Sequence, residues 1–352
     1  MIWTRDNTRR TLRWLVLIGV IAGLAPTVWL RSPTPAPNHD QALTITPLDI
    51  EPQSVGAAAL TGAWVLTSPN SIFGSYSALL IEPDNRFLAA SDAGQLLRFP
   101  KPGAEGIIRM ETLAGRTERR KKFIDIESLT RNAKTGATWV GFEGTNAIER
   151  FNAALTQSTR AQPPQMQTWS ANSGPESMVR LEDGRFVVLS EGFTEWGAAG
   201  FPGLLFPSDP VEGAAALEFT FAAPTGYRPV DMVQIPDGRA LVLVRAVHFG
   251  LPPYFTSKIL LADPADIAAG QVWSGEVIAE FAPPLPSDNM EGLAVEEGAD
   301  GALTLWVISD DNGATLQRTL LLRLEWTPDA EVPAAAPSAP IEKARSNAAR
   351  PS

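Results

Sequence analysis

The chain has no cysteine and only two histidines, and these scarcities remove several classes of chemistry. Without cysteine there is no disulfide, no thiolate nucleophile and no cysteine-ligated zinc site. One histidine, His39, lies in a proline-rich stretch, and the other is His248. A multi-histidine metal site is therefore excluded, and a Ser-His-Asp triad has only these two histidines to draw on.

Positive charge is also scarce. There are 29 Lys and Arg residues against 39 Asp and Glu residues, which gives a net charge of −10 at pH 7. This balance argues against nucleic acid or an anionic membrane surface as the main partner, and it is compatible with a bound cation. The sequence also lacks a G-x-S-x-G elbow, a P-loop and a dinucleotide fingerprint, which argues against an α/β-hydrolase or a nucleotide-binding fold.

The two ends of the chain differ in composition from its middle. An apolar, uncharged run over residues 14–30 follows several arginines. Residues 1–30 therefore predict a signal anchor, with a cleaved signal peptide as the alternative, and either one predicts export to the periplasm. If the leader is retained, residues 14–30 form a hydrophobic helix in the inner membrane. We expect a Pro-rich linker over 31–42, a folded domain over 43–326 and a disordered tail over 327–352.

One short unit recurs five times. It consists of a position that is often acidic, which we call the first slot, then a strand, a tight turn, a second strand and a second position that is often acidic, the second slot. The first slots are Ser77, Glu127, Glu176, Val230 and Glu291. The second slots are Asp92, Glu143, Glu191, Arg245 and Asp310. Turn pairs such as Asp183-Gly184 and Asp237-Gly238 separate the two strands, and we expect them to form two-residue hairpin turns.

Each unit is followed by further strand-like segments, such as 95–99 and 147–151, and by outer segments such as 217–221 and 277–281. Four strands repeated at about 50-residue intervals are typical of a β-propeller blade. The sequence therefore predicts an all-β propeller of four-stranded antiparallel sheets, preceded by one hydrophobic N-terminal helix. Five units are clear, and we expect residues 43–66 and the last strand to close a sixth blade, with five or seven blades as alternatives.

First strands line the central channel of a propeller, so equivalent positions in successive blades converge on its axis. Several carboxylates at close range must either take up protons or hold a cation. Oxygen ligands without cysteine or histidine suit Ca²⁺, and Mg²⁺ less well. The candidate metal ligands are Glu127, Glu176, Glu291, Asp92 and Glu143. The alternative is structural, since such carboxylates can accept backbone amides of the next blade.

The fourth unit breaks the acidic pattern, with Val230 and Arg245 in its slots. Arg245 can pair with a neighbouring acid, which we favour, or face an anionic substrate. His248 follows in a loop and is a candidate acid or base.

Several motifs together resemble one family. They are residues 73–79 with 89–92, 125–129, 174–178 with 189–192, and 288–293 with 307–312. This set, in this order, is similar to the bacterial phytase-like domain, also called the "esterase-like activity of phytase" family. The resemblance implies a β-propeller in an exported bacterial protein, and a hydrolase related to calcium-dependent propeller phytases.

The leading functional hypothesis is a metal-assisted hydrolase of phosphate or carboxylate esters, acting on a small molecule. Glu127, Glu176 and Glu291 would hold the cation, and Asp310 or Glu191 would act as the base, with His248 as a further candidate. A lactonase-type propeller is a close variant. The alternative is a non-catalytic binding or scaffold propeller in the cell envelope. We expect a monomer with no nucleic-acid partner.

Overall fold

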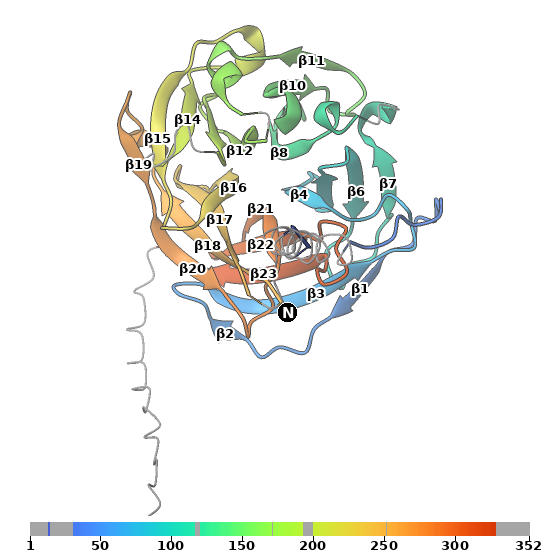
Figure 1. Ribbon diagram of the computed structural model, residues 1–352. Coiled ribbons are helices and arrows are strands. Elements are labelled where there is room, and N and C mark those ends of the chain that lie inside the picture. Colours follow the sequence, from blue (N-terminus) through green and yellow to red (C-terminus); the bar gives the residue numbers. More distant parts are fainter. Residues whose placement is uncertain are drawn as a thin grey trace, which may run out of the picture.

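The structure, a computed structural model, describes residues 13–14, 31–116, 120–170, 172–192, 200–250 and 252–328. These residues form a ring of five β-sheets around a central channel (Figure 1). Almost all regular structure is strand, with six short 3-10 turns between strands. The predicted all-β propeller is therefore confirmed.

Blades 1 and 2 are four-stranded and follow the chain order. Blade 1 consists of β4 (Tyr76–Ile81), β5 (Phe87–Ser91), β6 (Gln95–Phe99) and β7 (Arg109–Thr112). Blade 2 consists of β8 (Ile126–Arg131), β9 (Thr138–Phe142), β10 (Ala147–Phe151) and β11 (Ser158–Ala161).

Blade 3 takes an extra strand from the segment that leads to the outer edge of blade 4, because β19 pairs parallel to β15. Blade 3 consists of β12 (Pro175–Arg180), β13 (Phe186–Ser190), β14 (Phe201–Phe206), β15 (Leu217–Ala222) and β19 (Val272–Ser274). Blade 4 consists of β16 (Arg228–Gln234), β17 (Ala240–His248), β18 (Tyr254–Ala262) and β20 (Glu276–Phe281).

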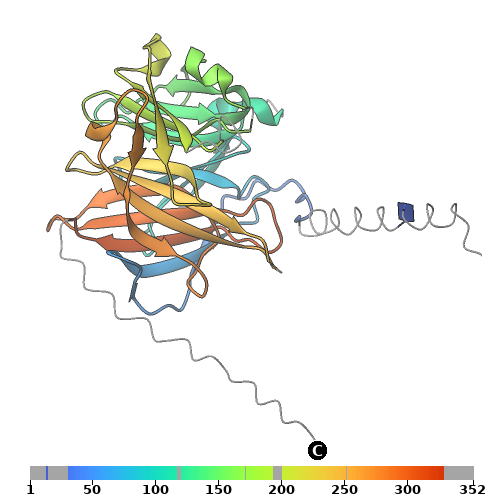
Figure 2. The same ribbon diagram turned by 60° about the vertical axis from the view of Figure 1, so that its left-hand side comes forward.

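Blade 5 joins the two ends of the folded chain. From the channel outward it contains β21 (Asn289–Glu297), β22 (Leu303–Asp310), β23 (Leu320–Trp326), β3 (Ala59–Thr67) and β1 (Thr44–Pro47), with β2 (Gln53–Ser54) beside β3. Leu320 pairs with Val65, and Leu322 pairs with Ala63. Figure 2 shows the blue N-terminal strand beside the red C-terminal strands.

The expected sixth blade is wrong, and the ring has five blades. Residues 43–66 supply one long strand and two short ones, which is too little for a separate sheet. The long strand, β3, instead completes the sheet begun by β21, β22 and β23. The predicted closure by both chain ends is correct in kind, and it protects sheet edges that would otherwise be exposed.

The core lies between the blades. Five apolar clusters fill the five interfaces between neighbouring sheets. On β13, Phe186 and Val188 pack toward blade 2, whereas Val187 and Leu189 pack toward blade 4. Second strands are therefore buried on both faces, which explains why their sequences are continuously apolar instead of alternating.

The hairpin turns are longer than the expected two residues. In blade 3, Leu181 N donates to Arg185 O at 2.8 Å, which closes a loop of residues 182–184. Of the pair Asp183-Gly184, only Gly184 has a positive φ, at 94°. The turn pairs thus mark the right positions, but they end loops of three residues, or of four residues in blade 2, and each loop has a single left-handed residue.

The segment before the propeller is tied to it at several points. Ser32 N donates to Gly313 O at 2.7 Å, and Asn70 Nδ2 donates to Asp40 O at 2.6 Å. The predicted hydrophobic helix at residues 14–30, apart from its first residue, and most of the predicted tail lie outside the described residues. Within the described part of the chain, no helix has the length and apolar character needed to cross a bilayer.

Candidate metal centre at one mouth of the channel

Every inner strand carries a β-bulge at the same place, and the first slots occupy it. In β8 the register passes from the Ile126–Phe142 pair to the Ser128–Gly141 pair, which leaves Glu127 as the extra residue. The same shift leaves Glu176 unpaired in β12 and Glu291 unpaired in β21. Ser77 and Val230 occupy the bulges of β4 and β16. A bulge redirects its side chain, so the repeated irregularity turns these residues toward one place.

The second slots lie at the same mouth of the channel. Asp92, Glu143 and Glu191 each follow directly after a second strand, next to the start of the inner strand. Asp310 pairs with Asn289, and Arg245 pairs with Arg228, at the equivalent level of blades 5 and 4. We call the end of the channel that carries these groups the acidic mouth; its acids are Asp92, Asp125, Glu127, Glu143, Glu176, Glu191, Glu291 and Asp310.

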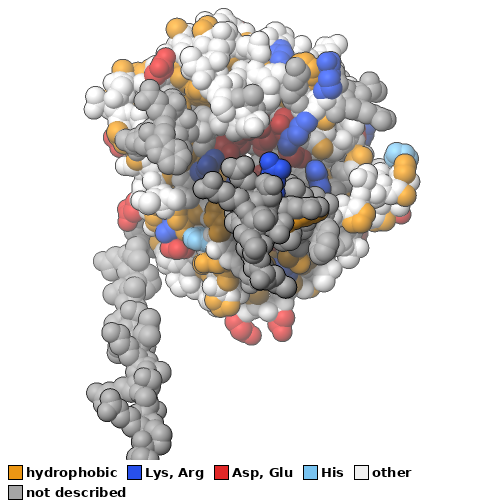
Figure 3. Space-filling view, viewed as in Figure 1, with side chains coloured by type: hydrophobic (Ala, Val, Ile, Leu, Met, Phe, Trp, Pro, Cys, Tyr) orange, Lys and Arg blue, Asp and Glu red, His pale blue; other side chains and the backbone are white. Residues whose placement is uncertain are grey.

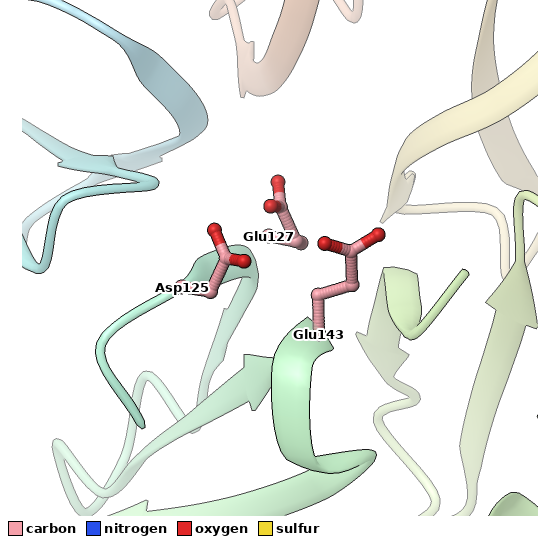
Figure 4. A group of neighbouring side chains, drawn as sticks. All are labelled: Asp125, Glu127 and Glu143. Atoms are coloured by element: carbon pink, nitrogen blue, oxygen red, sulfur yellow. The ribbon is translucent and has the colours of Figure 1, made fainter. Parts of the chain in front are cut away.

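Among the described residues, two groups of acids approach closely enough to share an ion. Carboxylate oxygens of Asp125, Glu127 and Glu143 all lie within 4.8 Å of one another, and so do those of Glu143, Glu176 and Glu191. Glu143 belongs to both groups. In Figure 4, Asp125, Glu127 and Glu143 point toward a common space. In Figure 3, acidic side chains gather at the centre of the ring, with basic side chains around them.

Burial and crowding oppose the ionisation of these acids. The pKa of Glu127 is raised well above its ordinary value by burial and then by repulsion from Glu176 and Glu291. The pKa of Glu176 is raised in the same way by burial and by repulsion from Glu191 and Glu143. Burial and repulsion from Asp125 raise the pKa of Glu143 to about 7. The group therefore needs either protons or a cation at neutral pH.

In blade 5, the negative charge of Glu291 is compensated by neighbouring protein groups. Arg245 forms ion pairs with Glu291 at 3.1 Å and with Glu191 at 3.4 Å, as expected for a lone cation among acids. Asn289 Nδ2 donates to Glu291 Oε1 at 2.7 Å. Glu291 thus lies near the predicted ligands Glu127 and Glu176 but outside the two close groups, and its charge is balanced by protein groups.

The remaining predicted residues have separate surroundings. Asp92 pairs with Lys121 at 3.0 Å, and Lys121 also approaches Asp125 at 3.4 Å. Asp310 is buried, and burial followed by repulsion from Glu291 raises its pKa well above the ordinary value. His248 stands three residues beyond Arg245 on β17, where its Nε2 lies 2.8 Å from Thr256 Oγ1 and its ring stacks on Tyr254.

Sequence reasoning missed two members of the site. Asp125 completes one acidic group, and Lys121 links Asp125 to Asp92. Asp125 stands two residues before Glu127, and this short spacing at a strand start was the available signal. Lys121 belongs to a basic run that favours a solvated loop, and nothing in its sequence neighbourhood indicates the contact with Asp92.

The slot acids were also considered as groups that hydrogen-bond to the backbone of the next blade. In the structure, the residue that follows the bulge forms these hydrogen bonds instead. Asp231 accepts the amide of Leu293 in blade 5 at 2.7 Å and that of Met232 at 2.8 Å. Ser128 Oγ donates to Pro175 O of blade 3 at 2.5 Å. These two side chains connect neighbouring blades, which leaves the bulge glutamates free of that task.

The donor set at the acidic mouth suits a hard cation. Glu176 Oε1 and Asn289 Oδ1 are buried and accept no hydrogen bond from any residue that the structure describes. Buried acceptor oxygens without a donor are costly in a protein but are the ligands that Ca²⁺ prefers. The residues present therefore fit a hard cation, which Glu143 would hold together with its neighbours Glu127 or Glu176 in the two close groups.

Comparisons with curated proteins and with solved structures give no match or distant matches only. No curated protein matches the chain significantly. Among solved structures, the luciferin-regenerating enzyme has 11% identity and a TM-score of 0.41, with 86% of this chain and 92% of that chain covered. A putative oxidoreductase (glucose dehydrogenase) from Thermus thermophilus has 13% identity and a TM-score of 0.40, with 71% and 97% covered. Hydrazine synthase from Kuenenia stuttgartiensis has 10% identity and a TM-score of 0.35; the match covers 68% of this chain but only 58% of that one. These likenesses are too weak to bear on function.

A comparison with protein-family models identifies the family of the chain. The family described as "Phytase-like: Esterase-like activity of phytase" matches residues 71–313. This range runs from just before β4 to just after β22 and includes all ten slots. The chain therefore belongs to the phytase-like family.

Proposed function

We propose that the protein is a metal-assisted hydrolase of a small phosphate or carboxylate ester, with Ca²⁺ at the acidic mouth. The observation that carries the proposal is the sharing of Glu143 by two close acidic groups from blades 2 and 3. Membership of the phytase-like family supports a small-molecule substrate. A bound calcium ion would polarise the ester and lower the pKa of a water molecule.

The chain's own residues divide into three roles. Glu127, Glu143 and Glu176 provide anionic oxygens for the ion. Arg245 forms ion pairs with Glu191 and Glu291, and these contacts hold the two carboxylates in place. Glu191 is then the acid of the second group best suited to accept a proton from water. Asp310, whose pKa is raised by burial, is better suited to donate a proton than to accept one.

Export and membrane attachment form a further part of the proposal. The hydrogen bond from Ser32 to Gly313 fixes the chain next to Asp310 and Asp311, immediately after the apolar run of residues 14–30. A retained signal anchor would therefore hold the acidic mouth toward the inner membrane, on its periplasmic side. Substrates would then reach the site close to the membrane surface.

The test is a panel of nitrophenyl phosphate, nitrophenyl acetate and lactone substrates, each measured with millimolar Ca²⁺ and with EDTA. We expect hydrolysis of one ester class that depends on Ca²⁺ and is lost in Glu176→Gln. The matched control Glu297→Gln alters an exposed acid at the far end of β21 and should keep the wild-type rate. Preference for the lactone would identify the lactonase variant.

Two outcomes would contradict the proposal. Hydrolysis that is equal in Ca²⁺ and in EDTA would remove the metal from the mechanism. Calcium binding that raises the melting temperature without any turnover would favour the non-catalytic scaffold.

A further inference from the structure

The channel has a second opening with different chemistry. A cavity of about 460 Å³ is lined by residues from all five inner strands, β4, β8, β12, β16 and β21, which ring the channel in Figure 1. Each inner strand begins with its bulge at the acidic mouth and ends at its hairpin turn. The lining extends to Pro83, Lys134 and Glu182 beside those turns. This far cavity therefore lies at the end of the channel opposite the acids.

The wall of the far cavity is mainly apolar. The five blades contribute Leu79, Leu129, Val179, Met232 and Leu293. These side chains are at most 5% exposed, so their positions are fixed by packing between blades. A preformed concave site with an apolar wall and a few polar groups, in the size range of small ligands, is the usual form of a small-molecule site.

The lining of the far cavity has an excess of one positive charge, with three cations, Arg131, Lys134 and Arg180, against two acids, Glu82 and Glu182. Arg131 pairs with Glu82 at 3.1 Å, and Glu82 is shared with Arg98, also at 3.1 Å. The Nε of Arg131 is buried and forms no hydrogen bond with the described part of the chain. Arg180 donates to the carbonyl of Leu181 at 3.1 Å and forms no ion pair with a described residue, and its charge is among the causes that lower the pKa of Asp183.

We propose that the far cavity binds a small amphiphilic anion, with its apolar body against the inner strands and its anionic head at Arg180 and Arg131. A guanidinium matches the geometry of a carboxylate or phosphate and binds either through paired hydrogen bonds. The acidic mouth would repel the same ligand, so the ligand enters from the far end. The site is independent of the hydrolytic function proposed above.

The experiment is calorimetric titration of the full chain with octanoate, octyl phosphate and octylamine. We expect the anions to bind and the amine not to bind. The carboxylate and phosphate arms identify the preferred head group. Arg180→Gln should weaken binding of the anions about tenfold, Arg180→Lys should restore part of it, and Glu176→Gln at the acidic mouth should bind as the wild type does.

The proposal is overturned if octylamine binds as well as octanoate, if Arg180→Gln binds octanoate as tightly as the wild type, or if neither anion binds at millimolar concentration. Matching circular dichroism spectra and melting temperatures of the Arg180 variants establish that a loss of binding is not a loss of fold.

Discussion

Replacing Glu143 by glutamine should stabilise the metal-free protein at neutral and alkaline pH. Burial and repulsion from Asp125 raise the pKa of Glu143 from 4.5 to about 7. A carboxyl group with a raised pKa binds its proton more tightly in the folded state. Its contribution to stability is therefore complete at pH values below 4.5 and is lost as the pH rises through about 7.

The magnitude follows from the pKa. At 1.36 kcal/mol for each pH unit, the change corresponds to about 3 kcal/mol. Glu143 is partly exposed, so solvent screening reduces the expected effect to roughly 1.5 kcal/mol. The glutamine variant also relieves repulsion on Glu176, for which Glu143 is one cause of the raised pKa, and this acts in the same direction.

The assay is urea unfolding in EDTA, followed by tryptophan fluorescence, from pH 4.5 to pH 8.5. The free energy of unfolding of the wild type should fall across this range by roughly 1.5 kcal/mol more than that of Glu143→Gln. Glu297→Gln, an exposed acid, should follow the wild type. Parallel pH curves for Glu143→Gln and the wild type would refute the electrostatic reasoning.

Three further predictions concern contacts between blades and at the acidic mouth. Asp231→Asn places an amide donor against the backbone amide of Leu293 or Met232, so the free energy of unfolding measured in urea should fall by about 1–3 kcal/mol. An unchanged unfolding midpoint would contradict the link between blades 4 and 5. Gly292→Ala puts a Cβ 2.9 Å from backbone atoms of Ala78 and Leu79, so overpacking should lower the free energy of unfolding by about 1–3 kcal/mol in the same assay. An unchanged free energy would mean that blades 5 and 1 can move apart to admit the methyl group. Arg245→Gln removes the ion-pair partner of Glu291 and Glu191 and should destabilise the metal-free protein by on the order of 3 kcal/mol, with a smaller loss of stability in Ca²⁺ as measured by calorimetry. Equal losses in both conditions would show that Arg245 and the metal centre are not energetically coupled.

The repeat could be predicted from the sequence because each blade repeats the same local chemistry. Turn residues such as Gly184 need a positive φ, and second strands such as β13 are buried on both faces. The number of blades could not be predicted in this way, because it depends on which strand β3 pairs with. The pairing of Val65 with Leu320 is set by a meeting of the chain ends that no local pattern records.

The convergence of the acids could also be predicted, because equivalent positions on inner strands share one axis. The distribution of charge among them could not. Glu127 and Glu291 occupy equivalent bulges, yet only Glu127 lies in a close acidic group, because Arg245 and Asn289 reach Glu291. The role of Lys121 depends on a loop that folds back to Asp92, 29 residues away in the sequence.

The most direct test of the account is an anomalous difference map from crystals grown in Ca²⁺. The account predicts one strong peak about 2.3–2.6 Å from carboxylate oxygens of Glu127, Glu143 and Glu176, which disappears in Glu143→Gln crystals. A map without a peak at the acidic mouth, at a calcium concentration of several millimolar, would contradict it.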